Sequence, residues 1–263
     1  MPPPGPGSTP LGSPAWGVLE VVVDPAIDER WQATFEARTG QHARLQAVAL
    51  PGLDAHIRHH LRRSLAVFQL GESGDGTHLL EAAGLSRASG AYIGALKHFV
   101  AEEQEHARML AVILDALDGP LLSRHWSDRL FVLARRARSL VTEVLVLLVA
   151  EVVALTYYST LRDGLPSGEL RDVFARIHDD ELLHVDFHCG TLPRHLDRFE
   201  RRTLSVVRIG WKALVAGAAL GVAISHGAAL KAMGTSRRQF VRRVLHDRDE
   251  TAKRLFDPDR RAT

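Results

Sequence analysis

Two copies of the motif Glu-x-x-His constrain this chain more than any other feature. The first copy is Glu103 and His106 in the run EEQEHARML, and the second is Glu181 and His184 in DDELLHVDFH. A lone glutamate in apolar sequence lies about 30 residues before each copy. The full set of candidates is Glu72, Glu103, His106, Glu151, Glu181 and His184. Four carboxylates and two imidazoles brought together from four helices would form a site for two metal ions.

The candidates fall on the helix faces that should point into the protein. Alternating steps of three and four residues connect Leu96, Phe99, Glu103, His106 and Leu110. Glu151 interrupts a stretch that is apolar almost all the way round. A buried carboxylate is stable only when it is protonated, paired with a base or bound to a cation. Because no lysine or arginine occupies these stripes, the pattern favours a bound cation.

Apolar periodicity predicts an all-α chain. Helix-period patterns begin at about residue 53, and strand-like alternation is confined to VLEVVVD near the start. We expect a four-helix bundle with additional C-terminal helices. The expected organisation is a disordered Pro/Gly-rich tail over 1–18, an N-terminal extension over 19–53, the bundle with its metal site over 54–192, and C-terminal helices packed on it over 193–263.

Capping residues predict where the helices begin. Asp54 should cap a first long helix that continues into the low eighties, and Ser89 a second that stops before Gly119. Ser167 should cap the fourth helix, after the break DGLPSG. The remaining helices are expected over 26–38, 195–232 and 235–256.

The start of the third helix has two interpretations. A single helix from Ser127 onward would extend well past the site, because Glu151 lies 24 residues into that stretch. Alternatively, residues 118–138 form a crossover with its own short helix, and the third helix begins near Ser139. We favour the crossover, since Glu151 then lies at the same depth as Glu103.

Depth along the helices supports two hairpins. Glu72 lies 11 residues before position 83, and Glu103 lies 13 after position 90. Glu151 lies 12 residues before position 163, and Glu181 lies 13 after position 168. At about 1.5 Å per residue these mismatches amount to roughly 2–3 Å, which a glutamate side chain can span.

Glu72 is the ligand candidate with the most competitors. Gln69 or Glu81 could replace it, and the glycines within 71–76 indicate either a helix irregularity beside the site or the end of the helix. On the third helix Glu143 is a weaker rival, because it lies eight residues too shallow.

The ligand chemistry favours iron or manganese. Glutamate oxygens with two imidazoles and no thiolate suit these metals better than a structural zinc site. The expected cofactor is a pair of iron ions, with manganese or a mixed pair as the alternative.

At these residues the chain resembles the ferritin-like superfamily of dimetal-carboxylate proteins, and phrases such as LVAEVVALTYY resemble a bacterial subgroup of it. The resemblance covers roughly 54–192. It implies that Glu103 and Glu181 bridge the metals and that Glu72 and Glu151 are terminal ligands. It also implies one imidazole per metal, from the two motif histidines.

The acidic residue before each motif glutamate is expected to be an outer partner. Asp180 looks like the family's residue that orients a ligating histidine on the opposite helix, and Glu102 occupies the matching place in the first motif.

Three further residues near the motifs carry two interpretations each. Tyr157 and Tyr158 are either redox-active or, as we favour, core aromatics whose hydroxyls bond to neighbours. His188 is either a third imidazole near the site or, as we favour, an ordinary histidine at the bundle end.

Composition excludes several classes of protein. A formal net charge of +2 gives no reason to expect a nucleic-acid partner, and the single cysteine, Cys189, excludes an internal disulfide and fits a reducing compartment. The first 18 residues lack the pattern of a secretory signal, so we expect a cytoplasmic protein.

The segment 213–230 is a marginal membrane candidate. It contains 18 residues without a formal charge and has Gly217 and Gly221 at GxxxG spacing. Small residues also allow close packing on a soluble bundle, and His226 would be costly in lipid. We favour soluble packing and keep membrane association as the alternative; the oligomeric state stays open, with a homodimer as one option.

The leading hypothesis is a di-iron oxidase or oxygenase that uses dioxygen and an electron donor to hydroxylate or desaturate a small organic substrate. A ferritin-like iron-binding ferroxidase is the first alternative. A metal-stabilised, membrane-associated interaction protein is the second.

Overall fold

The computed structural model describes residues 21–40, 44–123 and 139–257, and every regular element in these ranges is a helix. This confirms the all-α prediction for the described part of the chain. Residues 21–24 of the strand-like segment have no regular structure, whereas its first residues and the 1–18 tail lie outside the described ranges.

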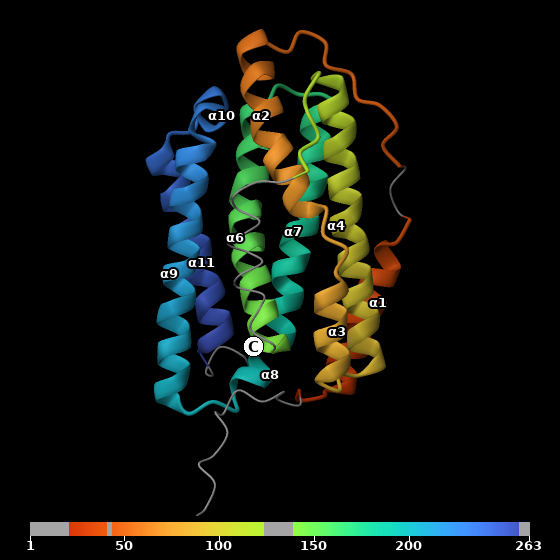
Figure 1. Ribbon diagram of the computed structural model, residues 1–263, viewed down its shortest axis with the longest axis vertical. Coiled ribbons are helices and arrows are strands. Elements are labelled where there is room, and N and C mark those ends of the chain that lie inside the picture. Colours follow the sequence, from red (N-terminus) through yellow and green to blue (C-terminus); the bar gives the residue numbers. More distant parts are fainter. Residues whose placement is uncertain (1–20, 41–43, 124–138, 258–263) are drawn as a thin grey trace, which may run out of the picture.

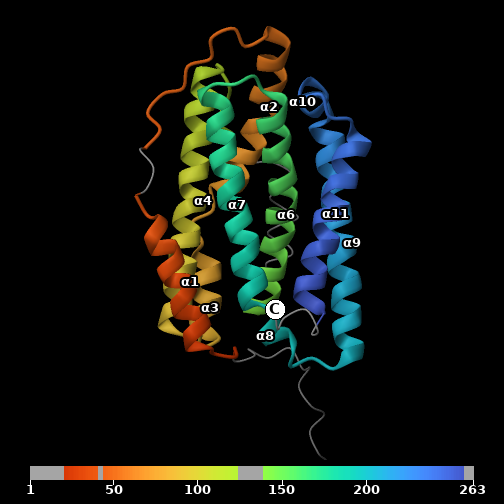
Figure 2. The same cartoon turned by 180° about the vertical axis from the view of Figure 1, so that it is seen from behind.

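Four helices lie side by side around the motif residues (Figure 1). They are α2 (Ala55–Glu72), α4 (Gly90–Ala116), α6 (Leu140–Gly164) and α7 (Glu169–Thr191). α2 is antiparallel to α4, and α7 is antiparallel to α6, whereas α4 and α6 are parallel (Figures 1 and 2). The segment between α4 and α6 therefore joins opposite ends of the molecule.

The capping predictions are largely confirmed. Asp54 accepts hydrogen bonds from the backbone N–H groups of His56 and Ile57 at the start of α2, and Ser89 accepts one from Tyr92 at the start of α4. The prediction that Ser167 caps α7 was wrong. The cap is Gly168, whose φ of 141° lies in a region that favours glycine.

The expected extent of the first long helix was also wrong. α2 ends at Glu72, and a separate helix, α3 (Thr77–Leu85), follows a short connection. Gly76 has a φ of +67°, and a Cβ at this position would overlap the side chain of Val100 on α4. The glycine cluster is therefore the end of a helix, and it lets the chain pass close to α4 before α3 continues along α4.

The third helix begins where the crossover interpretation placed it. α6 starts at Leu140, directly after Ser139. The short helix expected within the crossover falls largely on residues 124–138, which lie outside the described ranges.

The N-terminal extension contributes α1 (Pro25–Arg38), which packs on α4 and α7. Asp24 caps this helix by accepting a hydrogen bond from Ile27 N, and a proline occupies its first turn.

The C-terminal region differs from the single helix predicted over 195–232. The chain forms α8 (Pro193–Leu196), α9 (Arg201–Ser225) and α10 (Gly227–Ala232) instead. α9 ends at Ser225 and is followed by its C-cap residue His226, whose ring Nδ1 lies 2.7 Å from Ser64 Oγ on α2. This buried contact turns the chain toward α2, which a straight continuation of α9 could not do.

The last helix, α11 (Arg237–Phe256), agrees with the predicted range within two residues and begins with a capping box between Ser236 and Gln239. α9 and α11 pack against each other and against α6. In both views α9 forms the outer edge of the molecule (Figures 1 and 2).

Two of the described helices are long and apolar enough to cross a membrane by length and composition alone. They are α6, with a mean hydropathy of 2.1 in its most apolar window, and α9, with 1.5. Inside the protein 78% of the α6 window is buried, but only 22% of the α9 window.

Candidate metal centre

The structure brings all six motif residues together at the middle of the bundle. Glu72 is the last residue of α2, α4 and α7 each supply a Glu-x-x-His pair, and Glu151 lies halfway along α6. Within each of two groups, one ligand atom per residue lies within 4.8 Å of the others. The groups are Glu72, Glu103, His106 and Glu181, and Glu103, Glu151, Glu181 and His184. Because Glu103 and Glu181 belong to both, the arrangement can hold a metal ion in each group.

The ligand atoms themselves fit a metal. Five buried atoms in this cluster have no hydrogen-bond partner in the described structure: Glu103 Oε1, His106 Nδ1, Glu151 Oε2, Glu181 Oε1 and His184 Nδ1. They face one another closely. His184 Nδ1 lies 3.1 Å from Glu103 Oε1 and 3.3 Å from Glu151 Oε2, and His106 Nδ1 lies 3.4 Å from Glu181 Oε1. Buried ligand atoms that converge without hydrogen bonds are costly unless protonated imidazoles offset the carboxylates or a metal ion binds between them.

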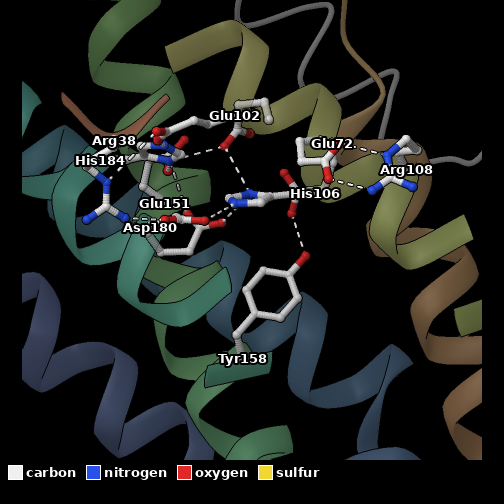
Figure 3. A network of polar contacts seen from close by, with 12 residues as sticks. Arg38, Glu72, Glu102, His106, Arg108, Glu151, Tyr158, Asp180 and His184 are labelled. Carbon is white, nitrogen blue, oxygen red and sulfur yellow. Dashed lines mark hydrogen bonds and ion pairs between the residues drawn. The ribbon is translucent and has the colours of Figure 1, made fainter. Parts of the chain in front are cut away.

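Each motif histidine is oriented by an acidic residue on the other motif helix (Figure 3). Nε2 of His106 lies 3.1 Å from Asp180 on α7, and Nε2 of His184 lies 3.0 Å from Glu102 on α4. An ionised carboxylate accepts the Nε2 proton and leaves Nδ1 directed at the cluster. The predicted outer partners are thus in place.

Arg38 is a contributor that the sequence did not reveal. It comes from the last turn of α1, forms an ion pair with Asp180, and its Nε lies 3.9 Å from Glu102 (Figure 3). The arginine holds both outer carboxylates on the side away from the cluster. Its position depends on how α1 docks on α4 and α7, for which a single arginine at a helix end gives no sequence signal.

In the metal-free protein the pKa values of the two motif glutamates are lowered, so their charged forms are favoured. Burial opposes ionisation of Glu103, but His106 and His184 outweigh it and lower the pKa of this carboxyl well below its ordinary value. Burial and the charge of Glu103 act against ionisation of Glu181, yet the same histidines lower its pKa.

The pKa values of the two lone glutamates, Glu72 and Glu151, shift in the opposite direction from those of the motif glutamates. Burial, followed by the charges of Glu103 and Glu181, raises the pKa of Glu72 and of Glu151 well above the ordinary value. Their protonated forms are therefore favoured in the metal-free protein, and a bound metal ion would displace these protons.

The histidines have raised pKa values in the metal-free state. Burial disfavours the charged form of His106, but Asp180 and then the motif glutamates outweigh it. For His184 the same opposition from burial is overcome by Glu102 and the cluster carboxylates. The metal-free cluster therefore keeps two imidazolium groups beside two carboxylates.

The tyrosine hydroxyls are bonded to neighbours, as the favoured interpretation predicted. Tyr158 donates to Glu72 Oε1 at 2.5 Å (Figure 3), and the hydroxyl of Tyr157 lies 2.6 Å from Ser64 Oγ. His188 belongs to neither group of ligand atoms, and its ring packs against Phe99.

The rival carboxylates lie outside both groups. Glu81 is exposed on α3. Gln69 is only partly buried on α2. Glu143 is buried but contributes no atom to either group. Glu72, the last residue of α2, therefore belongs to the cluster, whereas Glu81 and Glu143 do not.

A small cavity reaches the centre. Its volume is about 60 Å³, and it extends from the exposed Asp75 of the α2–α3 connection and the exposed His78 of α3 to Glu72 and Glu103. Glu143 also lines it. This cavity connects the surface with the candidate ligands and is large enough for a few water molecules.

No protein-family model matches this chain, and no curated protein matches it in sequence. The metal-binding interpretation therefore depends on the geometry of the cluster.

Proposed function

We propose that this protein is a ferritin-like di-iron oxidase or oxygenase, which uses dioxygen to oxidise a small organic substrate. The observation that carries the proposal is the convergence of five unpartnered buried ligand atoms from α4, α6 and α7. The course of α2, α4, α6 and α7 around them, with a crossover between α4 and α6, supports a ferritin-like bundle.

Each metal position would have a distinct set of ligands. Glu103 and Glu181 would contribute to both ions, since both belong to each group. Glu72 and His106 would complete one position, and Glu151 and its neighbour from α7, His184, the other. Oxygen-rich ligand sets of this kind suit iron or manganese. Two iron ions bound here would supply electrons for the reduction of dioxygen.

The chain's own residues would control protons and water. Asp180 and Glu102 hold the imidazoles in a single orientation, so that Nδ1 stays directed at the metals. Phe99 and Leu110, both buried on the ligand face of α4, place apolar side chains beside Glu103 and His106 and would limit the water at the cluster to what the small cavity admits. Tyr158 holds one oxygen of Glu72, which limits how far this carboxylate can move.

The size of the cavity favours one alternative, a ferroxidase without an organic substrate. A volume of about 60 Å³ has room for only a few water molecules, each of which needs at least about 10–15 Å³ of such space. Such a space admits dioxygen or a ferrous ion but not a large organic molecule unless the α2–α3 connection moves. If an organic substrate is used, it must be small or must bind at this connection.

Oxygen uptake separates the two functions. The protein is loaded with Fe(II) under anaerobic conditions and exposed to dioxygen with and without a panel of small organic compounds and an electron donor. A ferroxidase would consume oxygen in proportion to added iron only. An oxygenase would continue to consume it when a suitable compound and reductant are present.

A matched pair of variants controls for nonspecific iron oxidation. Glu103→Ala removes a ligand shared by both groups, whereas Glu105→Ala removes a carboxylate of the same helix that is bonded to Arg108 instead. Equal oxygen uptake by the two variants would refute the proposed site.

A further inference from the structure

α9 has two very different faces. Its inner face carries Trp211, Val215, Ala219 and Ala223, which are buried at four-residue steps against the rest of the protein. The indole N–H of Trp211 donates to the backbone carbonyl of Leu145 on α6. The helix is therefore fixed to the body along one side, and its other side remains at the surface.

The outer face of α9 concentrates exposed apolar side chains. Half of the ten large hydrophobic residues exposed in the described chain belong to this one helix: Val206, Ile209, Leu214, Leu220 and Ile224. Ile209 and Ile224 are 68% and 69% exposed. Scattered exposed hydrophobics need no explanation, but a continuous strip along a helix indicates a contact surface.

The strip has basic groups beyond both of its ends. Arg201 and Arg202 lie in the first turn of α9, and Lys231, Arg237 and Arg238 follow its far end. None of these five forms an ion pair with another residue in the part of the chain that the structure describes. At the first end Asp197 and Glu200 offset part of the charge, whereas no acidic residue occurs between 227 and 246.

The charges argue against a second copy of this chain as the occupant. Two α9 helices would bring basic ends together whether they paired in parallel or antiparallel. The contact would also be small. A helix of 25 residues is about 37 Å long and about 10 Å wide, so one face offers roughly 400 Å². A stable dimer buries about 800 Å² on each partner.

An anionic lipid surface fits both the apolar strip and the basic ends. We propose that the outer face of α9 docks this protein on a membrane containing anionic lipids, with the helix lying flat in the interface and the rest of the protein in water. The apolar side chains enter the boundary between headgroups and acyl chains, and the basic residues meet lipid phosphates. The proposal does not depend on the metal centre, whose candidate ligands lie on α2, α4, α6 and α7. α7 and α9 lie on opposite sides of α6 (Figure 2).

Vesicle co-sedimentation tests the proposal with the full chain. Wild-type protein should bind vesicles of phosphatidylglycerol and phosphatidylcholine, bind pure phosphatidylcholine vesicles at least tenfold more weakly, and lose affinity as salt is raised. The double variant Ile209→Glu/Ile224→Glu should lose binding. Leu85→Glu, which changes an equally exposed leucine at the end of α3, should bind as the wild type does.

A charge variant tests the basic ends separately. Arg237→Ala/Arg238→Ala leaves the strip intact and should weaken binding to the anionic vesicles on the order of fivefold per residue removed. Circular dichroism of each variant verifies that the helices remain folded.

Three results would overturn the proposal. The first is wild-type protein that does not bind the anionic vesicles. The second is a loss of binding in Leu85→Glu as large as that in the double variant. The third is a dimer, measured by sedimentation equilibrium, that the double variant converts to monomer, since this would assign the strip to a second copy of the chain.

Discussion

α6 and α9 have the same length and similar composition, yet the protein uses them in opposite ways. Each contains 25 residues and is apolar enough to cross a membrane, but α6 is largely buried and α9 is largely exposed. α6 lies between α7 on one side and α9 and α11 on the other, so it has neighbours around most of its circumference. Among the residues that the structure describes, α9 has neighbours on one face only. Whether an apolar helix is buried therefore depends on how many other helices pack around it and not on its composition alone.

The polar residues of the two helices differ accordingly. α6 places Glu151 in the core, where a carboxylate needs a proton or a cation, and it lies beside His184. The outer face of α9 carries no charge from Ala213 to its end at Ser225. On α6 the buried Glu151 belongs to a group of candidate ligand atoms, and on α9 the exposed apolar strip is the surface that we propose to dock on a membrane.

Leucine truncation should give the largest contrast between the two helices. Leu148→Ala on α6 removes a fully buried side chain and should lower the free energy of unfolding by about 2–5 kcal/mol. Leu220→Ala on α9, at a half-exposed position, should change it by about 0.5 kcal/mol or less. Urea denaturation measures both. Equal losses would mean that α9 is covered in solution.

Acidification should lower the free energy of unfolding through the buried His188, whereas an imidazole on the exposed face of α9 should have no such effect. Burial lowers the pKa of His188 to about 3, below the value of about 6.5 expected in the unfolded chain. The unfolded state therefore binds more protons between these values, so stability decreases as the pH falls from 6.5. By pH 5 the loss from this residue should be about 2 kcal/mol.

Two substitutions separate this effect from other titrations. His188→Leu should remove that part of the pH dependence. Ile209→His, which places an imidazole on the exposed face of α9, should leave the wild-type dependence unchanged. Denaturation at pH 7 and pH 5 makes the comparison, and an added slope in Ile209→His would show that the face is buried.

Glu151→Gln should separate stability from metal binding. Glutamine resembles the protonated carboxyl, which is the form that the raised pKa of Glu151 favours in the metal-free protein. Unfolding of the metal-free variant should therefore match the wild type within about 1 kcal/mol. Added Fe(II) should stabilise the variant less than the wild type, by at least about 1.4 kcal/mol for a tenfold loss of affinity. An unchanged effect of iron would remove Glu151 from the ligand set.

Substitution of two neighbouring tyrosines of α6 should give the smallest effects and tests whether Tyr158 positions Glu72. Tyr158→Phe removes the donor to Glu72 and should cost about 1 kcal/mol and about tenfold in metal affinity. Tyr157→Phe removes the bond to Ser64 instead and should cost a similar amount of stability with no change in metal affinity. Calorimetric metal titration distinguishes them, and equal affinities would show that Tyr158 does not position Glu72.

The sequence predicted the cluster because its information is local to each helix. Steps of three and four residues placed Glu103 and His106 on a buried face, which needs only helix geometry. The partners Asp180 and Glu102 were predicted from the resemblance to the ferritin-like superfamily, and both contact the motif histidines.

Contacts between distant segments could not be predicted in the same way. The close approach of the chain at Gly76 to Val100 ends α2 at Glu72, and the bond between His226 and Ser64 ends α9. The helical period continues across both breaks, so the pattern alone predicted longer helices. Arg38 likewise reaches the site only because α1 docks there.

Counting metal ions per chain tests the central claim most directly. Purified protein is titrated with Fe(II) under anaerobic conditions, and bound iron is measured for the wild type, for Glu181→Ala, and for Asp179→Ala as an exposed control on the same helix. The wild type and Asp179→Ala should bind two ions per chain, and Glu181→Ala should bind fewer because Glu181 belongs to both groups of ligand atoms. A wild type that binds no iron, or a Glu181→Ala variant that still binds two ions, would contradict this account.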